Sequence, residues 1–421
     1  MGTTVNLQPP RGTHDALPEM SRRFRFIEET VLKVFKGYGF GEIRTPMFES
    51  TDVFARNVGD TTDIVTKEMY TFTDRGGDSL SLRPEGTAPV VRAYYSNGLK
   101  QHLPLKLCYV GTPMFRYERP QKGRLRQHHQ VGAEVFGVAG PMAEVELIAM
   151  AFDFLRALGM QEDFYVQLNS LGTAEERATY REALVTYFEP HKAKLSAESK
   201  DRLVKNPLRI LDSKDEADRA LLADAPKLSD YLGEASATHF EAVKQGLDAL
   251  GIRWQVNDTL VRGLDYYSHT VFEIHSDALG AQSQVVSGGR YNALIGQMGG
   301  DDVPAVGFGC GVERLELMLA EGAVPTTRPI AFVVMGDAAT RAGLALARTL
   351  RQKGLEVYVP LDPLSVKGQM KKANKLEATH TVVIGDEELK TGIYVLKDMD
   401  AGTQNNLSPD AIIAHLCGGA A

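Results

Sequence analysis

M-F-R-Y-E-R-P-Q-K-G-R-L-R-Q-H-H-Q, residues 114–130, stands between the apolar runs L-C-Y-V and V-G-A-E-V-F. It holds five basic residues and one acid, Glu118. Pro120 and Gly123 favour a loop, so the pattern predicts two strands joined by a long, arginine-rich turn. Because guanidinium groups bind phosphate oxygens bidentately, such a hairpin is suited to gripping a polyphosphate. An exposed hairpin that is merely solvated is the alternative.

The bulk composition is typical of a soluble enzyme. The chain has 421 residues, 43% of them hydrophobic and 24% charged, which predicts two or three domains. No apolar run approaches the roughly 18 residues of a membrane helix, and the first residues lack the apolar core of a signal peptide. Three distant cysteines give no disulfide framework, so we expect a cytoplasmic protein without a membrane partner. The net charge of -7 argues against indiscriminate binding of nucleic acid but not against a selective partner.

The N-terminal part of the sequence predicts a mostly antiparallel sheet flanked by helices. Phe24, Ile27 and Val31 recur at helical spacing, and G-E-I-R-T-P-M-F-E, residues 41–49, reads as a strand closed by Pro46. Y-T-F-T-D and S-L-S-L-R flank a two-glycine turn and predict a hairpin that leads into the helix T-A-P-V-V-R-A-Y-Y. Hairpins with helices between them favour an α+β domain over a nucleotide-binding series of parallel strands.

The sequence changes character twice after this part. Residues 171–251 consist of charged helical stretches and predict a helical insertion. Strand-like sequence returns in W-Q-V-N-D-T-L-V-R-G-L-D-Y-Y, T-V-F-E-I-H and A-Q-S-Q-V-V-S-G-G-R-Y. P-A-V-G-F-G-C-G-V-E-R-L then reads as a strand, a glycine turn and a helix. Beyond the linker A-E-G-A-V-P-T-T-R-P, strands and helices alternate, which predicts a separate α/β domain of about a hundred residues over 328–421.

Two segments combine glycine with ionisable groups beside a predicted strand. In L-R-P-E-G-T-A, Glu85 and Thr87 flank a glycine where backbone donors and side chains can converge on an ammonium group. The alternative is a helix cap with Thr87 as the N-cap and Pro89 in the first turn. In S-G-G-R-Y-N-A-L, adjacent glycines allow close approach of a ligand to the backbone, or simply a turn.

Two further segments carry arginines that are candidates for binding an anion. V-R-G-L-D-Y-Y-S places Arg262 where burial is costly unless an anion meets it. The tyrosines Tyr266 and Tyr267 can form one wall of a pocket, and a structural Arg262–Asp265 pair is the alternative. In G-F-G-C-G-V-E-R-L, Arg314 stands one turn into a predicted helix.

Several familiar sites are missing from the sequence. It has no G-x-x-x-x-G-K-[ST] loop, no H-E-x-x-H, no C-x-x-C and no G-x-S-x-G, so we expect no metal held by protein side chains and no hydrolase nucleophile. Four lysines at helical spacing form either a solvated face or a contact with a phosphate backbone: Lys367, Lys371, Lys372 and Lys375.

Taken together, these segments resemble the class II aminoacyl-tRNA synthetases, and among them the bacterial-type histidyl-tRNA synthetases. T-P-M-F-E, F-R-Y-E-R-P-Q-K-G-R and G-V-E-R-L resemble the three motifs of the class. L-R-P-E-G-T, V-R-G-L-D-Y-Y and G-G-R-Y resemble signatures of the histidine-specific family. The resemblance covers nearly the whole chain. It implies a catalytic domain over 1–325 that contains the insertion, an anticodon-binding α/β domain over 328–421, and a homodimer.

The resemblance also implies an activity and a set of site residues. The chain would activate L-histidine with ATP, supplied with Mg²⁺, and transfer histidine to tRNA(His). Arg116, Arg262 and Arg314 would be catalytic and would hold the phosphates. The expected ATP-binding residues are Arg116, Glu118, Arg124, His128, Arg262 and Arg314. The expected histidine-binding residues are Glu85, Thr87, Gln130, Glu134, Tyr266 and Tyr267. The expected tRNA-binding residues are Arg119, Gln121, Lys367, Lys371, Lys372 and Lys375.

Several positions depart from the family pattern, among them Ser287 before the glycines of G-G-R-Y and L-E-A at Leu376 in place of L-G-A. His128 replaces the phenylalanine that stacks on adenine, and Asn292 replaces an acid after G-G-R-Y. The alternative function is that of a catalytically inactive, synthetase-like regulatory subunit that senses histidine. That kind of protein lacks the anticodon-binding domain and loses catalytic arginines. The anticodon-binding domain and the catalytic arginines are both present in this sequence, so the active enzyme is favoured.

Overall fold

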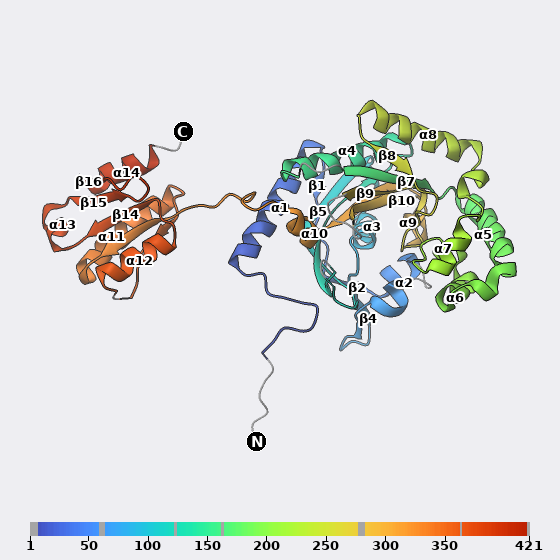
Figure 1. Ribbon diagram of the computed structural model, residues 1–421, viewed down its shortest axis with the longest axis horizontal. Coiled ribbons are helices and arrows are strands. Elements are labelled where there is room, and N and C mark those ends of the chain that lie inside the picture. The colour runs from blue at the N-terminus through green and yellow to red at the C-terminus, as the bar shows by residue number, and fades with distance from the viewer. Residues whose placement is uncertain are drawn as a thin grey trace, which may run out of the picture. The chain divides into compact units, whose positions relative to one another are not determined.

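The computed structural model (Figure 1) describes residues 7–58, 64–121, 124–160, 164–276, 283–362 and 364–418. Contacts divide the chain into two compact units, residues 1–324 and 325–421. No helix within the described ranges is both long and apolar enough to cross a membrane. The predicted fold class is confirmed: the first unit is a large sheet flanked by helices with a helical insertion, and the second is an α/β unit.

An eight-stranded sheet forms the centre of the first unit, in the order β1-β5-β6-β11-β10-β9-β7-β8. The strands from β5 to β7 pair antiparallel, while the outermost pairs, β1–β5 and β7–β8, are parallel. The sheet is therefore antiparallel through its centre, as predicted, and mixed at its edges. Its strands are β1 (Gly41–Glu42), β5 (Leu105–Phe115), β6 (Gln127–Phe136), β7 (Phe164–Ser170), β8 (Trp254–Val256), β9 (Ser268–Ser276), β10 (Gln284–Arg290) and β11 (Ala305–Gly311).

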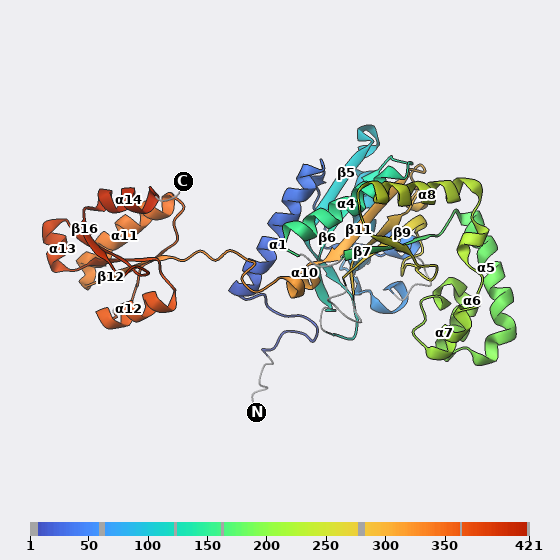
Figure 2. The same ribbon diagram turned by 45° about the horizontal axis from the view of Figure 1, so that its top comes forward.

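Helices cover one face of this sheet and close its main core. Helix α1 (Pro18–Gly37) buries Phe24, Ile27 and Val31, which confirms the predicted helical periodicity. It packs against α4 (Met142–Ala157) and α10 (Val312–Met318), and α8 (Glu234–Ala249) lies across α4 and β9 (Figure 2). The odd-numbered residues of β6 from Val131 to Val135 enter this core. Because successive side chains of a strand alternate, the even-numbered residues of β6 face the opposite side.

The opposite side of the sheet carries the smaller elements and a second core. A three-stranded sheet has the order β2-β4-β3, and its central strand, β4, is followed along the chain by α3. Hydrogen bonds join this region to the long β5–β6 hairpin: Phe115 N donates to Arg83 O, just after β4, and Tyr117 N donates to Glu68 O, the last residue of η1. These elements are β2 (Phe48–Ser50), α2 (Asp52–Val58), η1 (Ile64–Glu68), β3 (Thr71–Thr73), β4 (Ser79–Leu82), α3 (Thr87–Ser96), η2 (Leu99–His102) and α9 (Leu294–Gln297).

The segment between β7 and β8 is helical and lies beside the sheet (Figure 1). Thr173 begins α5 with a capping box, in which its hydroxyl accepts from Glu176 N and the Glu176 carboxylate accepts from Thr173 N. The elements are α5 (Ala174–Phe188), η3 (Glu189–Lys194), α6 (Ala197–Lys205), η4 (Pro207–Ile210), α7 (Glu216–Leu222), η5 (Leu228–Tyr231) and α8. We call this segment the insertion.

The second unit has a five-stranded sheet in the order β13-β12-β14-β15-β16. Helices α11 and α14 lie on one face of this sheet and α12 on the other (Figure 2). The elements are β12 (Ile330–Val334), α11 (Gly336–Gln352), β13 (Val357–Tyr358), α12 (Val366–Lys375), β14 (His380–Ile384), α13 (Asp386–Thr391), β15 (Tyr394–Asp398), β16 (Gln404–Leu407) and α14 (Pro409–Cys417).

The structure corrects several predicted elements. The strand expected over 41–49 is two short strands, β1 and β2, and the chain bends at Met47, next to Pro46, whose carbonyl accepts a hydrogen bond from Arg83. Most of the strand expected after Trp254 is loop, because pairing ends at Val256. The glycine turn expected before α10 is absent, since β11 runs directly into that helix. The sequence analysis also missed α13 and β16, both of which are short.

Candidate active site

A basic pocket of about 330 Å³ opens at the ends of β6, β10 and β11. It gathers six of the residues predicted from sequence: Arg116, Glu118, Arg124, His128, Gln130 and Arg314. Glu68 and Arg209, which the sequence analysis did not single out, also line it. We call it the arginine pocket.

Backbone carbonyls hold two of its arginines in place. Arg116 directly follows β5, and its Nε donates to Pro84 O at 2.8 Å. Arg314 lies in the first turn of α10, and its Nη1 donates to Gln284 O. Backbone carbonyls thus fix the orientation of both guanidinium groups, and Glu118 Oε1 lies 4.0 Å from Arg116 Nη1.

The two histidines of β6 are held differently. Burial, and to a smaller extent the charge of the neighbouring Arg116, lowers the pKa of His128 to about 4. The ring is therefore neutral near pH 7. His129 packs on the other face, where its Nδ1 lies 2.8 Å from Glu313 Oε1 and its backbone N–H donates to the same carboxylate. Glu313 thereby ties α10, which carries Arg314, to the hairpin strand. A neutral imidazole at position 128 retains a flat face on which an aromatic base can stack.

Beside the arginine pocket lies a closed cluster of acids and tyrosines. Glu134 is fully buried, accepts a hydrogen bond from Thr87 Oγ1 at 2.7 Å through Oε1, and accepts from the Tyr291 hydroxyl through Oε2. Glu85 is also buried and accepts from Thr87 N at 2.7 Å and Ala88 N at 2.8 Å. The helix-cap alternative is therefore wrong in its detail: Gly86 is the N-cap of α3, and the Glu85 carboxylate binds its first free N–H groups.

Burial disfavours the ionised form of the Glu134 and Glu85 carboxyl groups. It raises the pKa of Glu134 to about 8, although hydrogen bonds from Tyr291 and Thr87 oppose the shift. Burial likewise raises the pKa of Glu85 against the hydrogen bonds from Ala88 and Thr87. A cation or a hydrogen-bond donor that binds between the two acids would stabilise their ionised form. The cluster is thus suited to a small ligand with an amino group and a ring N–H.

Three tyrosines enclose this cluster. The ring centroids of Tyr266 and Tyr267 are 4.6 Å apart, and those of Tyr266 and Tyr291 are 5.6 Å apart. All three rings are buried. The predicted aromatic wall is therefore present, with Tyr291 as a third member that the sequence analysis left out.

Glycines on β11 make room for the site. Gly307 pairs with Glu134 across the sheet, and a Cβ at Gly307 would collide with the Glu134 carboxylate. A Cβ at Gly132, which lies between Gln130 and Glu134 on β6, would likewise collide with the Tyr109 ring. Close packing against Glu134 therefore explains Gly307, whereas Gly309 and Gly311, where a Cβ would meet only ordinary contacts, line the arginine pocket.

Arg262 does not line the arginine pocket. Its Nη1 forms an ion pair with Glu273 of β9, and its guanidinium lies 5.6 Å from the centroid of the Tyr267 ring. The expected Arg262–Asp265 pair is thus wrong, because Glu273 supplies the carboxylate. Burial acts to lower the pKa of Arg262, but the charge of Glu273 outweighs it and raises the pKa. Glu273 in turn contacts His275 Nε2 at 3.0 Å, and His275 Nδ1 contacts Ser283 Oγ at 2.8 Å.

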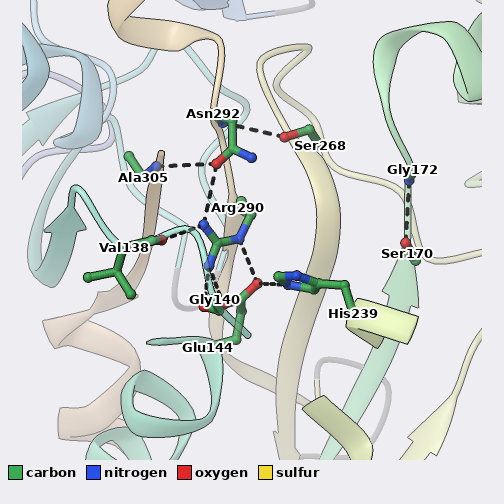
Figure 3. A network of polar contacts seen from close by, with 10 residues as sticks. All are labelled: Val138, Gly140, Glu144, Ser170, Gly172, His239, Ser268, Arg290, Asn292 and Ala305. Atoms are coloured by element: carbon green, nitrogen blue, oxygen red, sulfur yellow. Dashed lines mark hydrogen bonds and ion pairs between the residues drawn. The ribbon is translucent and has the colours of Figure 1, made fainter. Parts of the chain in front are cut away.

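A buried ion pair holds the end of β10, directly before Tyr291. Arg290 and Glu144 are both fully buried, and Arg290 Nε donates to Glu144 Oε1 at 2.7 Å (Figure 3). His239 of α8 contacts the same carboxylate oxygen at 2.8 Å. Burial alone would raise the pKa of Glu144, but Arg290 and His239 lower it. Asn292 places its Oδ1 3.4 Å from Arg290 Nη1 and 3.3 Å from Ala305 N, so a neutral amide suffices beside an arginine already paired with an acid.

The predicted tRNA-contacting residues fall in two places. Arg119 lines a shallow hollow of about 400 Å³ with Arg11, Tyr117 and Arg126. Gln121 lies at the end of the hairpin loop, where its N–H donates to Arg124 O; Lys122 and Gly123 of that loop lie outside the described residues.

The four lysines belong to α12 of the second unit. Lys367, Lys371 and Lys375 are exposed, whereas Lys372 is half-buried with its Nζ 5.8 Å from the centroid of the Tyr358 ring. Within the described ranges, no group of three or more His, Cys, Asp or Glu side chains could hold a metal ion.

The antiparallel sheet, the arginine-bearing hairpin and the arginine at the β11–α10 junction define a class II aminoacyl-tRNA synthetase. Comparison with known proteins narrows this class. The histidyl-tRNA synthetase family profile matches residues 12–315, and an anticodon-binding domain profile matches residues 330–416. The chain belongs to the histidyl-tRNA synthetase family.

Individual relatives agree with this assignment. The chain is 53% identical to a histidine–tRNA ligase of Rhodospirillum rubrum over 95% of this chain and 96% of the relative. It is 48% identical to one of Gluconacetobacter diazotrophicus over 98% and 99%. Among solved structures, apo histidyl-tRNA synthetase of S. aureus superposes with a TM-score of 0.81 at 36% identity, covering 97% of this chain and 99% of that one.

Proposed function

We propose that the chain is a histidine–tRNA ligase. It activates L-histidine with ATP to histidyl-adenylate and then transfers histidine to the 3′ end of tRNA(His). One observation carries the proposal most directly: His128, Gln130 and Glu134 lie on one face of β6, so a single strand runs from the arginine pocket into the acid and tyrosine cluster. This arrangement suits a nucleotide and an amino acid bound side by side.

In the first step, a carboxylate oxygen of histidine attacks the α-phosphorus of ATP and pyrophosphate leaves. Negative charge grows on the phosphoryl oxygens, and arginines fixed in advance stabilise it. Arg116 holds the α-phosphate, Arg314 the γ-phosphate, and Arg262 contacts the α-phosphate from the other side. ATP enters as its Mg²⁺ complex, with Glu118, Arg124 and His128 around the nucleotide. The protein needs no nucleophile of its own, because positioning and electrostatics supply the catalysis.

Selection of histidine rests on the buried cluster. Glu85, Thr87 and Gln130 surround the amino group, and Glu134, Tyr266 and Tyr267 surround the imidazole. A site that satisfies both ring nitrogens rejects analogues lacking them by roughly four to five orders of magnitude, because its own buried groups would stay unpaired. A separate editing site is then unnecessary.

In the second step, a hydroxyl of the terminal ribose of tRNA(His) attacks the adenylate carbonyl and AMP leaves. Arg119 and Gln121 face the end of the acceptor stem. Lys367, Lys371, Lys372 and Lys375 present a basic helix surface to the anticodon region. The enzyme acts in the cytoplasm as a homodimer, as the family resemblance implies.

The regulatory alternative has less support. Arg116, Arg262 and Arg314 are all present, and the second unit matches the anticodon-binding domain. A protein titled as an ATP phosphoribosyltransferase regulatory subunit/histidyl-tRNA synthetase, from Bacillus halodurans, shares the fold with a TM-score of 0.65 at 23% identity. That likeness concerns the fold alone.

Histidine-dependent exchange of labelled pyrophosphate into ATP tests the proposal. Purified protein should catalyse exchange with L-histidine and give background rates with the other amino acids. Measurable histidine binding without exchange would favour the regulatory function instead.

A further inference from the structure

Two polar residues of β9, Glu273 and His275, face the side of the sheet that carries the arginine pocket. Ile274, which stands between them, enters the main core, so the side chains on either side of it point the opposite way. Across the sheet, Glu273 pairs with Ser287 and His275 pairs with Gln284. Because Ser287 and Gln284 both line the arginine pocket, the two polar residues of β9 lie in the next row behind its wall.

The Glu273 carboxylate joins a cation to a histidine. Its Oε1 forms the ion pair with Arg262 Nη1, and its Oε2 lies 3.0 Å from His275 Nε2. Because an ionised carboxylate only accepts hydrogen bonds, His275 Nε2 is the donor in this contact. The other ring nitrogen of His275 lies 2.8 Å from Ser283 Oγ, and the Tyr165 ring stacks on the imidazole at a centroid distance of 5.6 Å. Both oxygens of the carboxylate are therefore held.

The Arg262 side chain lies at the border between the arginine pocket and the tyrosine wall. Gly263, the next residue, lines the arginine pocket, and the Arg262 guanidinium lies 5.6 Å from the centroid of the Tyr267 ring. Arg262 Nε is inaccessible to solvent and makes no hydrogen bond within the part of the chain that the structure describes. A buried N–H of this kind is costly, so the atom favours an acceptor brought by a ligand.

A guanidinium group in this position needs a partner that also fixes its direction. The side chains of Arg262 and Glu273 are each 14% exposed, and the carboxylate charge offsets the cost of burying the cation. Glu273 engages Nη1, which leaves the Nε edge of the planar group for a ligand. A glutamate side chain loses rotamer freedom when it is ordered, and the hydrogen bond from His275 restricts that freedom in advance. The contacts in series therefore hold Arg262 in one orientation.

We propose that Glu273 and His275 are positioning residues for the formation of the adenylate. This role rests on the proposed ligase function, and in particular on the contact of Arg262 with the α-phosphate. Glu273 aims the guanidinium group at the phosphoryl oxygens on which negative charge grows, and His275 fixes the Glu273 carboxylate. Both residues act through Arg262. Because fixed charges stabilise a transition state only when they are oriented before the reaction, loosening this chain should slow the chemical step and spare substrate binding.

The kcat and KM values of histidine-dependent pyrophosphate exchange, measured on a double-mutant cycle, test the role. The cycle consists of wild type, Glu273→Gln, Arg262→Ala and the variant with both substitutions. His275→Asn is a second test, because it removes the Nε2 contact and leaves the ion pair of Arg262 and Glu273 in place. Glu146→Gln is the matched control, since it takes the carboxylate from another ion pair of the same unit, with Lys106, away from the site.

Glu273→Gln should lower kcat roughly 10- to 100-fold, as a small misplacement of a catalytic group does, while the KM for histidine stays within about twofold of wild type. His275→Asn should lower kcat in the same direction but by less, and Glu146→Gln should match the wild type. The variant that lacks both Glu273 and Arg262 should be no slower than Arg262→Ala alone, because two substitutions that remove one function are not additive.

Three results would overturn the positioning role and leave the ligase function standing: a wild-type kcat in Glu273→Gln, an unchanged rate in Arg262→Ala, or losses that multiply in the double variant. Circular dichroism identifies a Glu273→Gln protein that does not fold. In that event kcat of His275→Asn decides, and a wild-type value overturns the proposal. Absence of exchange in the wild type would instead overturn the proposed function, and the positioning role with it.

Discussion

Replacement of Glu134 by glutamine should change how the stability of the catalytic unit depends on pH. The Glu134 side chain is fully buried, and its pKa rises from 4.5 to about 8 on folding. Between these values the folded protein keeps a proton that the unfolded chain has lost. Because the unfolded state then binds fewer protons, the free energy of unfolding falls as pH rises. Glu134→Gln removes this titration and with it the pH-dependent loss.

The magnitude follows from the two pKa values. Each pH unit inside the window is worth about 1.4 kcal/mol, so the wild type should lose about 3 to 4 kcal/mol relative to Glu134→Gln between pH 5 and pH 8. The variant also exchanges hydrogen bonds with Thr87 and Tyr291. That exchange adds an offset that varies little with pH, so the prediction concerns the slope and not the absolute stability.

Urea unfolding followed by tryptophan fluorescence measures this slope. Trp254 is the single tryptophan of the chain and lies in the first unit, so its signal reports that unit. Titrations at fixed protein concentration, at intervals from pH 5 to pH 8.5, give the free energy of unfolding of each protein. Glu321→Gln, which removes an exposed carboxylate from the same unit, is the matched control. If wild type and Glu134→Gln give parallel curves, Glu134 is not the buried proton carrier inferred here.

Three further variants, one of them a double substitution, test other residues of the two units. Arg262→Ala should reduce histidine-dependent pyrophosphate exchange by roughly 100-fold or more, as loss of a transition-state contact does, while histidine binding measured by calorimetry persists; an unchanged exchange rate would remove Arg262 from the mechanism. Lys371→Ala/Lys372→Ala should weaken tRNA binding in filter assays and leave pyrophosphate exchange unchanged, and unaltered tRNA affinity would make the helix a solvated surface. Arg290→Ala leaves the buried Glu144 with His239 but without its arginine, so the free energy of unfolding should fall by about 3 to 5 kcal/mol in the tryptophan assay. A loss below about 1 kcal/mol would show that the contact with His239 is enough to hold the carboxylate.

The fold was predictable where local periodicity was strong. The spacing of Phe24, Ile27 and Val31 predicted α1, and the apolar runs on either side of the arginine-rich turn predicted the β5–β6 hairpin. Local signals failed at short elements such as β16, where three polar residues and a leucine become a strand only because β15 lies beside them. The strand expected after Trp254 ended early for a similar reason, since pairing with β7 stops at Val256.

The site was predictable only in part, because its geometry joins distant segments. The arginines and the acids were visible as motifs, but Glu273, the partner of Arg262, carries no local signal on β9. Tyr291 stood in a recognised motif, yet its contact with Glu134 spans 157 residues of sequence and appears only in the folded chain. The need for glycine at position 307 was also invisible in the sequence, because its cause is the carboxylate of Glu134 across the sheet.

Charging of tRNA tests the central claim most directly. The purified protein, given ATP, Mg²⁺, labelled L-histidine and a tRNA(His) transcript, should convert the label into acid-precipitable histidyl-tRNA, and a transcript of another tRNA should stay uncharged. Failure to charge tRNA(His) by a protein that is folded and binds histidine would contradict the assignment as a histidine–tRNA ligase.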